Sequence, residues 1–433
     1  MSRFSSVSRS VVGRAMVTLL GFIFLLAPLA SCGTPAPLQF TSLNLGIPAE
    51  ALKSPVSGPL ADNTRLHVRF TFKIDPNLLK QADQQRVQPG QSSRLQDFAK
   101  KIGIDDGTYQ KIKDFFLKNF SVVNVDGSPQ QALGESTLDI QMVAGLARSI
   151  NIRMYQTDAS DNTNDVWVNV NDELQQLIDD NVNNTSAGNV VSISLGAAEG
   201  EMTQQDMQAL DSSFQQLSRV LHMSVLVASG DCGAFTSQRY GDLSVSFPAS
   251  DPWVIAVGGT ILNPSNTGGR ANEVVWSDNS NRSRCKNQWG SGGGNSAIFK
   301  RPGWQNASGV NNRYSQGARQ LPDVSAAAYA LAVYFQGRWG AVGGTSAAAP
   351  IWGAGLALVN QGLLQQTHQL ANVATTAQQF YAVASRSGGL HPYYDVTSGN
   401  NLYYPAVPGW DFATGLGTPD LPDFYQVMLN NFK

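Results

Sequence analysis

The stretch Gly343-Gly-Thr-Ser-Ala-Ala-Ala-Pro350 predicts the start of a helix that carries a reactive serine. Two glycines before Ser346 permit a sharp entry into the helix and a close approach of another molecule. Small residues after it allow tight packing, and Pro350 suits the first turns of a helix. The Ser346 hydroxyl would lie in the field of the helix N-terminus, which favours developing negative charge. The alternative is a small-residue helix packed on a sheet, but the full motif favours a nucleophilic Ser346.

Outward from this motif, strands alternate with helices from about residue 121 onward. Apolar runs predict strands at 151–155, 190–195, 224–228 and 251–257. Helical spacing predicts helices at 138–146, 171–182, 204–221 and from 346 to at least 359. Near-continuous apolar strands between helices are typical of a parallel sheet covered on both faces. The pattern therefore predicts an α/β fold with a mostly parallel sheet flanked by helices.

A nucleophilic serine needs a base, which is most often a histidine. The chain has four histidines, namely His67, His222, His368 and His391. His391 lies in a loop with Gly and Pro, but none of the four stands in the glycine-rich setting typical of a base that serves a nucleophilic serine. We therefore interpret each as a structural or solvated histidine, and look for the base among the carboxylates.

Glu135-Ser-Thr-Leu-Asp139 places two acids four residues apart at the start of the first predicted core helix, so both point to one side. Two carboxyls this close can share a proton, which raises one apparent pKa. Glu135 could accept the Ser346 proton while Asp139 holds Glu135 in place, as in a serine triad. The alternative is a pair of acids favoured only by the helix N-terminus.

Asp231 follows the predicted strand 224–228 within Ala228-Ser-Gly-Asp-Cys-Gly233. Active sites of open α/β sheets lie at the carboxyl ends of the strands. A buried, protonated Asp231 could donate a hydrogen bond to a tetrahedral oxyanion. The alternative is a turn aspartate between two glycines.

Together these motifs resemble the sedolisins, serine-carboxyl peptidases with a subtilisin-like fold. The resemblance covers the chain from about Ser121 to its end, through the strings Glu135-x-x-x-Asp139, Ser229-Gly-Asp231, Phe247-Pro-Ala-Ser250, Val257-Gly-Gly-Thr260, Gly292-Gly-Gly294, Leu321-Pro-Asp-Val324 and Gly344-Thr-Ser346. It implies a catalytic triad of Ser346, Glu135 and Asp139. It also implies that Asp231 completes the oxyanion hole and that the protein acts at acid pH.

The C-terminal loops Tyr394–Asn400 and Val407–Asp411 resemble the calcium-binding loops of that family. Calcium prefers carboxylate and carbonyl oxygens. The resemblance implies a Ca²⁺ cofactor, and assigns as ligands the side chains of Asp395 and Asp411 and the carbonyls of Val396, Val407 and Gly409. Taken without the family, turns rich in Asn and Gly are the default interpretation.

The N-terminus predicts export. Three arginines precede an uncharged run from Ala15 to Ala30, and Leu29-Ala-Ser-Cys32 resembles a bacterial lipobox. This predicts a lipoprotein signal peptide over 1–32 and membrane attachment through a lipidated Cys32; an ordinary signal peptide and an uncleaved anchor are the alternatives. Residues 33–63 resemble a flexible tether. Cys232 and Cys285 remain as a potential disulfide or as two free thiols.

Residues 64–120 resemble part of a sedolisin prodomain, followed by a peptidase domain over 121–433. Only the stretch 120–134 separates this module from Glu135. The rest of a prodomain and the first strand and helix of the catalytic domain are then missing, which would leave an edge or gap in the sheet.

The whole sequence predicts an exported serine-type endopeptidase that hydrolyses polypeptide substrates at acid pH. Charged residues make up 14% of the chain and the formal net charge is −2, so nothing indicates nucleic-acid binding. We expect a monomer that is anchored to the outer face of a bacterial cell membrane or extracellular. The alternatives are an inactive, peptidase-derived surface-binding lipoprotein and a Ser-His-Asp subtilisin.

Overall fold

The computed structural model describes residues 120–126, 134–147, 150–157, 166–183, 188–237, 242–265, 269–278, 288–335, 338–367 and 376–431. Two compact units divide the chain, Met1–Leu66 and His67–Lys433, and every described residue belongs to the second. The export signal, the tether, Cys32 and nearly all of the predicted prodomain module lie outside the described residues.

Four parallel strands form the main sheet in the order β13-β7-β5-β3, and a fifth strand, β8, pairs antiparallel with β7. Their bounds are β3 Val190–Ile193, β5 Ser224–Ala228, β7 Ile255–Pro264, β8 Arg270–Val275 and β13 Val324–Ala327. The predicted parallel sheet is confirmed. The strand expected at 251–257 begins later, because the Asp251 carboxylate accepts the Trp253 N–H (2.8 Å) and holds a turn there.

Helices cover both faces of this sheet, as its apolar strands require. On one face, Leu226 and Val257 pack with Trp352 and the helices α9 Thr345–Thr367, α10 Ala377–Ser385 and α11 Leu421–Asn431. On the other face, Val225 and Val227 pack against α7 Val166–Asn183 and α8 Gln204–Gln215, which continues as a π-helical turn to Val220. Successive residues of β5 thus point into different cores.

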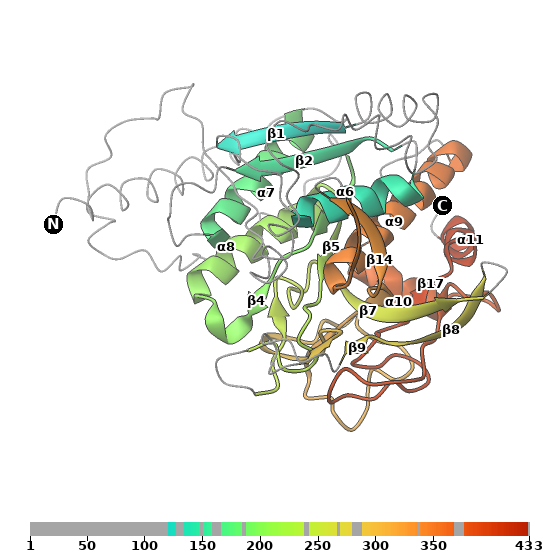
Figure 1. Ribbon diagram of the computed structural model, residues 1–433. Coiled ribbons are helices and arrows are strands. Elements are labelled where there is room, and N and C mark those ends of the chain that lie inside the picture. The colour runs from blue at the N-terminus through green and yellow to red at the C-terminus, as the bar shows by residue number, and fades with distance from the viewer. Residues whose placement is uncertain are drawn as a thin grey trace, which may run out of the picture. The chain divides into compact units, whose positions relative to one another are not determined.

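Strands β1 (Phe120–Asp126) and β2 (Ile152–Thr157) form a separate parallel pair, connected in sequence through α6 (Gly134–Leu146). Figure 1 shows the two strands side by side above the main sheet. Val125 and Tyr155 share a hydrophobic core with Ile193 of β3. Nevertheless, no ladder joins β2 to β3 among the residues that the structure describes.

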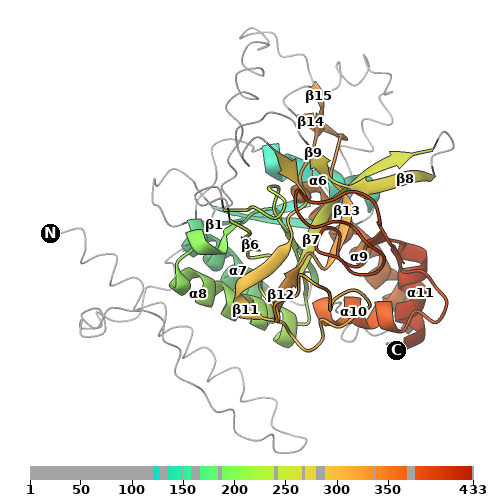
Figure 2. The ribbon, with the colours of Figure 1, turned by 90° about the horizontal axis from the view of Figure 1, so that it is seen from below.

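A hairpin of β14 (Leu331–Phe335) and β15 (Arg338–Val342) leads into α9 and projects beyond the core next to α6 (Figure 2). The other short elements are β4 Ala197–Ala198, a 3₁₀ turn Glu199–Glu201, β6 Ser246–Phe247, β9 Ser277–Asp278, β10 Trp289–Gly290, β11 Gly294–Lys300, β12 Ala318–Leu321, β16 Tyr393–Tyr394 and β17 Thr418–Pro419. The region 263–320 is thus loop-rich with short strands, as its composition indicates.

Helix α9 is the central helix of the fold. The segment Thr345–Gln366 is long and apolar enough to cross a membrane, but 67% of its most apolar window is buried inside the protein. Its buried side chains pack against β3, β5, β7 and β13. Its hydrophobicity is therefore explained by its place in the core.

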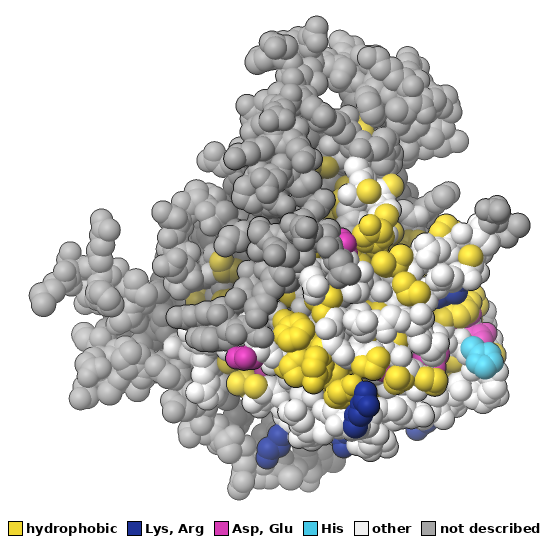
Figure 3. All heavy atoms as spheres, turned by 60° about the horizontal axis from the view of Figure 1, so that its bottom comes forward, with side chains coloured by type: hydrophobic (Ala, Val, Ile, Leu, Met, Phe, Trp, Pro, Cys, Tyr) yellow, Lys and Arg dark blue, Asp and Glu magenta, His cyan; other side chains and the backbone are white. Residues whose placement is uncertain are grey.

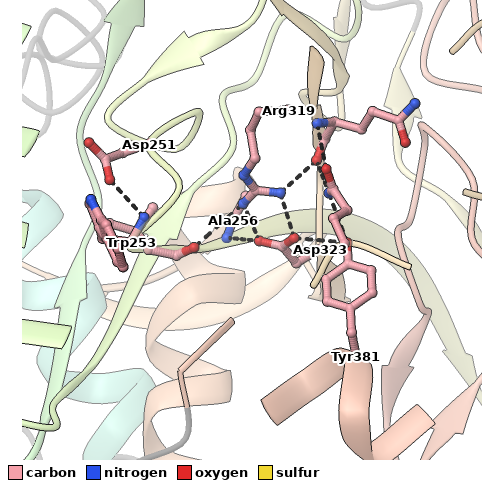
Figure 4. Close-up of polar contacts among 9 residues, drawn as sticks. Asp251, Trp253, Ala256, Arg319, Asp323 and Tyr381 are labelled. Atoms are coloured by element: carbon pink, nitrogen blue, oxygen red, sulfur yellow. Dashed lines mark hydrogen bonds and ion pairs between the residues drawn. The ribbon is translucent and has the colours of Figure 1, made fainter. Parts of the chain in front are cut away.

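A buried ion pair between Arg319 and Asp323 connects β7, α10 and the loop before β13 (Figure 4). Arg319 is fully buried and donates two hydrogen bonds to the Asp323 carboxylate. Asp323 also accepts the Ala256 N–H (2.8 Å) and the Tyr381 hydroxyl (2.9 Å). Both oxygens of the Asp323 carboxylate accept hydrogen bonds. These contacts therefore fix β7 and α10 relative to the loop before β13.

Few charged side chains lie on the described part of one face of the protein. On the face drawn in Figure 3, hydrophobic and uncharged polar side chains dominate, with scattered Lys, Arg, Asp and Glu. This agrees with the low charged fraction of the sequence.

Candidate active site

Ser346 is the second residue of α9, at the carboxyl edge of the main sheet, and is partly buried. Gly344 precedes it with a φ of 146°, in the region that favours glycine. A Cβ at Gly344 would lie 3.1 Å from Asp231 Oδ2. The glycine therefore allows the Asp231 carboxyl to lie beside the start of the nucleophile helix.

Asp231 follows β5, and its carboxyl is held by Thr345. The Thr345 backbone N–H (2.8 Å) and hydroxyl (2.9 Å) both donate to Asp231 Oδ1. The same hydroxyl accepts the Gly230 N–H (3.1 Å). Because Oδ1 accepts two donors, the proton of a neutral Asp231 belongs on Oδ2, the oxygen beside Gly344.

The second glycine motif permits another close approach at this edge. Gly292 N–H donates to the carbonyl of Gly230 (2.8 Å). A Cβ at Gly292 would lie only 2.0 Å from the carbonyl oxygen of Ser229. The Gly292–Gly294 run therefore lets a second backbone segment pack directly onto the loop that carries Asp231.

Glu135 and Asp139 lie one turn apart on α6, and both face α9. The Ser346 side chain lies close enough to the Glu135 carboxyl to affect its titration, and Glu135 Oε1 is buried without a hydrogen-bond partner among the described residues. Burial is the main cause that raises the pKa of Glu135; the Ser346 side chain lowers it, and the nearby Asp231 raises it further. The structure thus brings together all four residues that the sequence singled out.

The pKa of Asp139 is raised well above its ordinary value, first by burial and then by the charge of Glu135. A hydrogen bond from the Ser194 hydroxyl (2.9 Å) opposes this rise. Two buried carboxyls that repel each other hold at least one proton over the acid range. The pair can therefore accept one proton from Ser346 without leaving two adjacent negative charges.

Helix α6 is fixed by the hairpin β14–β15 and by α9. Gln141 donates to the carbonyl of Tyr334 (2.7 Å) and accepts its N–H (2.9 Å). Leu138 packs with Val333 and Ala347, all of them buried. These contacts set how far the carboxyl pair lies from Ser346.

Ser194 and Thr345 are site residues that the sequence interpretation missed. Ser194 follows β3 and contacts both Asp139 and the backbone carbonyl of Ser346. The sequence placed Ser194 inside the strand expected at 190–195, whereas β3 ends at Ile193 and leaves Ser194 at the carboxyl edge of the sheet. Thr345 lies within the quoted motif, but its bonds to the Asp231 loop depend on tertiary packing.

The histidines lie elsewhere or outside the described residues. His222 is exposed and precedes β5, at the opposite end of that strand from Asp231. His391 is also exposed. His67 and His368 fall outside the described ranges. The geometry therefore favours the carboxyl pair over either described histidine as the partner of Ser346.

Cys232, directly after Asp231, is disulfide-bonded. Cys285 lies in 279–287, outside the residues that the structure describes. A disulfide at Cys232 adds a covalent constraint to the loop that presents Asp231.

The two acids assigned to calcium meet on one loop. Asp395 accepts the Gly409 N–H (2.8 Å), and Asp411 accepts the Val407 N–H (2.9 Å). Burial raises the pKa of Asp395 and raises that of Asp411 to about 6. Within the described residues no three His, Cys, Asp or Glu side chains form a metal-binding group. The two carboxylates and the neighbouring carbonyls are nonetheless the hard oxygen donors that calcium prefers.

The sequence and the fold are similar to those of known proteins. The subtilase family model matches residues 127–416. Sedolisin from Pseudomonas sp. (strain 101) is 33% identical over 318 residues, which are 70% of this chain and 50% of that protein. Kumamolisin from Bacillus sp. (strain MN-32) is 32% identical over 316 residues, 69% of this chain and 52% of that protein. The chain thus spans about half the length of these relatives.

A solved structure of Pseudomonas sedolisin, a serine-carboxyl proteinase complexed with two molecules of pseudo-iodotyrostatin, is similar to the model with a TM-score of 0.62. The two are 30% identical, and the match covers 74% of this chain and 89% of that one. The fold, the family model and these relatives agree with the resemblance seen in the sequence. The chain belongs to the subtilase family and, within it, to the sedolisins.

Proposed function

We propose that this chain is a serine-carboxyl endopeptidase that hydrolyses peptide bonds at acid pH. The observation that carries the proposal is that α6 places the buried, unpartnered Glu135 Oε1 near Ser346, one helical turn from Asp139, which Ser194 connects to the Ser346 backbone. A serine beside a buried carboxyl, with neither described histidine near it, can use a base whose proton affinity has been raised by burial.

In the acylation step, Ser346 Oγ attacks the carbonyl carbon of the scissile peptide and Glu135 accepts the hydroxyl proton. Asp139 stabilises Glu135 by sharing a proton with it. The carbonyl oxygen becomes an oxyanion, which accepts a hydrogen bond from Asp231 when that carboxyl carries a proton. Preorganised donors of this kind typically contribute a factor of about 10²–10³ to the rate.

Collapse of the tetrahedral intermediate breaks the C–N bond, and the protonated Glu135 delivers its proton to the departing amine. This leaves an ester on Ser346. A water molecule then attacks the ester carbon while Glu135 accepts the water proton. The resulting intermediate breaks the bond to Ser346 Oγ, which recovers its proton from Glu135 as the acid product leaves.

The pH dependence follows from the carboxyls. The active form of the pair carries one proton, so activity falls on the acid side when both carboxyls are protonated and on the alkaline side when both are ionised. Asp231 must also stay protonated to donate its hydrogen bond. Activity should therefore be lost as pH rises above the raised pKa values.

Calcium would be held by Asp395 and Asp411 with the carbonyls of Val396, Val407 and Gly409, and its charge would neutralise these acids. We infer that its contribution is structural, because the two aspartates already close the 407–411 loop through backbone N–H groups. Chelation should lower the melting temperature, and Asp395→Asn should weaken that response.

We further infer export and lipid attachment at Cys32, on the basis of the charged, apolar and small-residue segments of 1–32. Mass spectrometry of the N-terminal peptide from membranes tests this. A diacylglyceryl-modified Cys32 supports the anchor, whereas an N-terminus elsewhere identifies another mode of export or processing.

Proteolysis of an acid-denatured protein at several pH values tests the function, using the full chain, Ser346→Ala and Glu135→Gln. Ser346→Ala should reduce cleavage to background while keeping a native circular dichroism spectrum. Equal cleavage by wild type and Ser346→Ala would overturn the proposal. No cleavage by well-folded wild type would favour the second candidate, an inactive surface-binding protein derived from a peptidase.

A further inference from the structure

The side chain of Ser194 spans two parts of the site. It is 6% exposed, and its hydroxyl oxygen lies 2.9 Å from Asp139 Oδ1 and 3.0 Å from the backbone carbonyl oxygen of Ser346. We propose that Ser194 is a positioning residue that couples the protonation of Asp139 to the backbone of the nucleophile. The proposal rests on the proposed function for its kinetic consequences, but not for the geometry.

Pro350 explains why the Ser346 carbonyl is available to Ser194. In an α-helix, the carbonyl of Ser346 would accept the N–H of the residue four positions later. That residue is Pro350, which lies inside α9 and has no N–H. The Ser194 hydroxyl supplies a donor to this carbonyl. Because of Pro350, the backbone carbonyl of the nucleophile Ser346 lacks its usual helical donor and can accept the Ser194 hydroxyl.

Ser194 has one hydroxyl proton for its two acceptors. An ionised Asp139 is the stronger acceptor, because a hydrogen bond to a charged group is stronger than one to a neutral carbonyl. When Asp139 is neutral, the hydroxyl can turn to the Ser346 carbonyl and accept the Asp139 proton in return. Each protonation state of Asp139 thus imposes its own hydrogen bond on the first turn of α9.

Few other ionisable groups act on Asp139. Glu135 raises its pKa, and Asp231 acts in turn on Glu135. Among the described elements that pack most closely on α6, α9 contains no Asp, Glu, Lys, Arg or His and β14 brings Tyr334; the segment 190–195, which carries Ser194, has no charged residue either. A change in the titration of Asp139 in a Ser194 variant can therefore be assigned to the lost hydroxyl.

The kinetic test compares the pH dependence of kcat and KM for wild type and Ser194→Ala. Loss of the hydroxyl should lower kcat roughly tenfold at the optimum and leave KM nearly unchanged. It should also move the alkaline limb upward by about one pH unit, since the ionised Asp139 loses a stabilising bond. A purely structural defect would lower kcat without extending activity to higher pH.

Two variants serve as matched controls. Ser194→Thr retains the hydroxyl and should keep the wild-type alkaline limb. Ser192→Ala removes a hydroxyl two residues earlier on the same side of the chain, which is buried but has no hydrogen-bond partner among the described residues. Ser192→Ala should therefore leave the pH profile unchanged.

A carbon-13 NMR titration of labelled aspartate carboxyls, with Asp139→Asn for assignment, gives an answer that does not need turnover. The pKa of Asp139 should rise in Ser194→Ala. It should fall in Pro350→Ala, because the restored N–H at position 350 satisfies the Ser346 carbonyl and leaves the Ser194 proton to Asp139.

An unchanged Asp139 titration in Ser194→Ala, or shifts of the same sign in both variants, would overturn the role of Ser194. Wild type that fails to cleave any peptide would overturn the proposed function alone. Opposite shifts in the two variants would then still establish the coupling. The two proposals therefore fail under different observations.

Discussion

Different parts of the fold hold the serine side of the site, Ser346 and Asp231, and its acid side, Glu135 and Asp139. Ser346 and Asp231 extend from α9 and β5, and every residue of β5 is buried within the five-stranded sheet. Glu135 and Asp139 extend from α6, in which Leu138 is the buried apolar residue and whose flanking strands β1 and β2 form a separate pair. The serine side is thus fixed by the main core, whereas the acid side is fixed by the packing of α6 on α9 and on the hairpin β14–β15.

We therefore expect mutations in the main sheet to lower mainly stability and mutations around α6 to lower mainly the catalytic rate. A change in the main sheet alters the free energy of unfolding of the whole domain, because the strands unfold cooperatively. A change around α6 alters the distance between Glu135 and Ser346 with a smaller effect on global unfolding. A displacement of about 1 Å between reacting groups is enough for a large loss of rate.

Replacing Glu135 by Gln removes the proposed base but keeps a side chain of nearly the same size and shape. The amide cannot accept the Ser346 proton, so kcat should fall by a factor of about 10²–10⁴. The melting temperature should remain the same or rise, because a buried ionisable group is removed. Single-turnover kinetics with a peptide ester checks the rate, and an unaffected kcat would exclude Glu135 as the base.

Leucine truncation on the two sides sharpens the comparison. Leu226→Ala in β5 and Leu138→Ala in α6 both remove a buried side chain, which usually costs about 2–5 kcal/mol. Leu226→Ala should show the larger loss in urea unfolding, with kcat retained in the folded fraction. Leu138→Ala should lose less stability and more kcat. The opposite ranking would contradict the division between the two supports.

Removing the link between α6 and the hairpin should have a smaller effect. Gln141→Ala deletes two hydrogen bonds to the backbone of Tyr334, each with a net contribution of about 1 kcal/mol. We expect roughly a tenfold loss in kcat/KM. Gln156→Ala, which removes an exposed bond to Asn124 between β1 and β2, is the control and should change little.

The support of the acid side should also respond to pH. Glu173 of α7 is buried and bonds to Thr157 of β2, and burial raises its pKa well above the ordinary value. The native state then binds this proton more tightly than the unfolded chain. The resulting stability is present below about pH 4.5 and is lost as pH rises through the raised pKa.

The melting temperature of wild type should therefore decline as the pH is raised from about 4 toward neutral. In Glu173→Gln this decline should be shallower, whereas Glu201→Gln, at an exposed position, should follow wild type. Identical curves for wild type and Glu173→Gln would show that this carboxyl does not contribute.

Much of the main sheet and the nucleophile motif at Ser346 were predictable, because their signals are local, whereas the roles proposed for Glu135, Asp139 and Asp231 came from the resemblance to the sedolisins. Buried parallel strands are continuous apolar runs, and Ser346 and Asp231 stand at the helix start and strand end that follow such runs. The strand at 251–257 was placed too early, since apolar residues alone do not reveal that Asp251 forms a turn.

The connections between the two sides could not be predicted from the sequence. Gln141 and Tyr334 are separated by 193 positions, and Ser194 and Ser346 by 152. The Pro350 ring was interpreted as a helix-start preference, while its missing N–H matters because Ser194 is close by. Such effects depend on tertiary packing and leave no periodic pattern in the chain.

The most direct test of the central claim is the rate at which a fluorophosphonate labels Ser346 at acid pH, measured by intact mass and peptide mapping. The account predicts one label on wild type, located at Ser346, and a labelling rate at least about 100-fold lower in Glu135→Gln. Equal labelling of the two proteins, or a label on another residue, would contradict the claim that the α6 carboxyl activates the α9 serine.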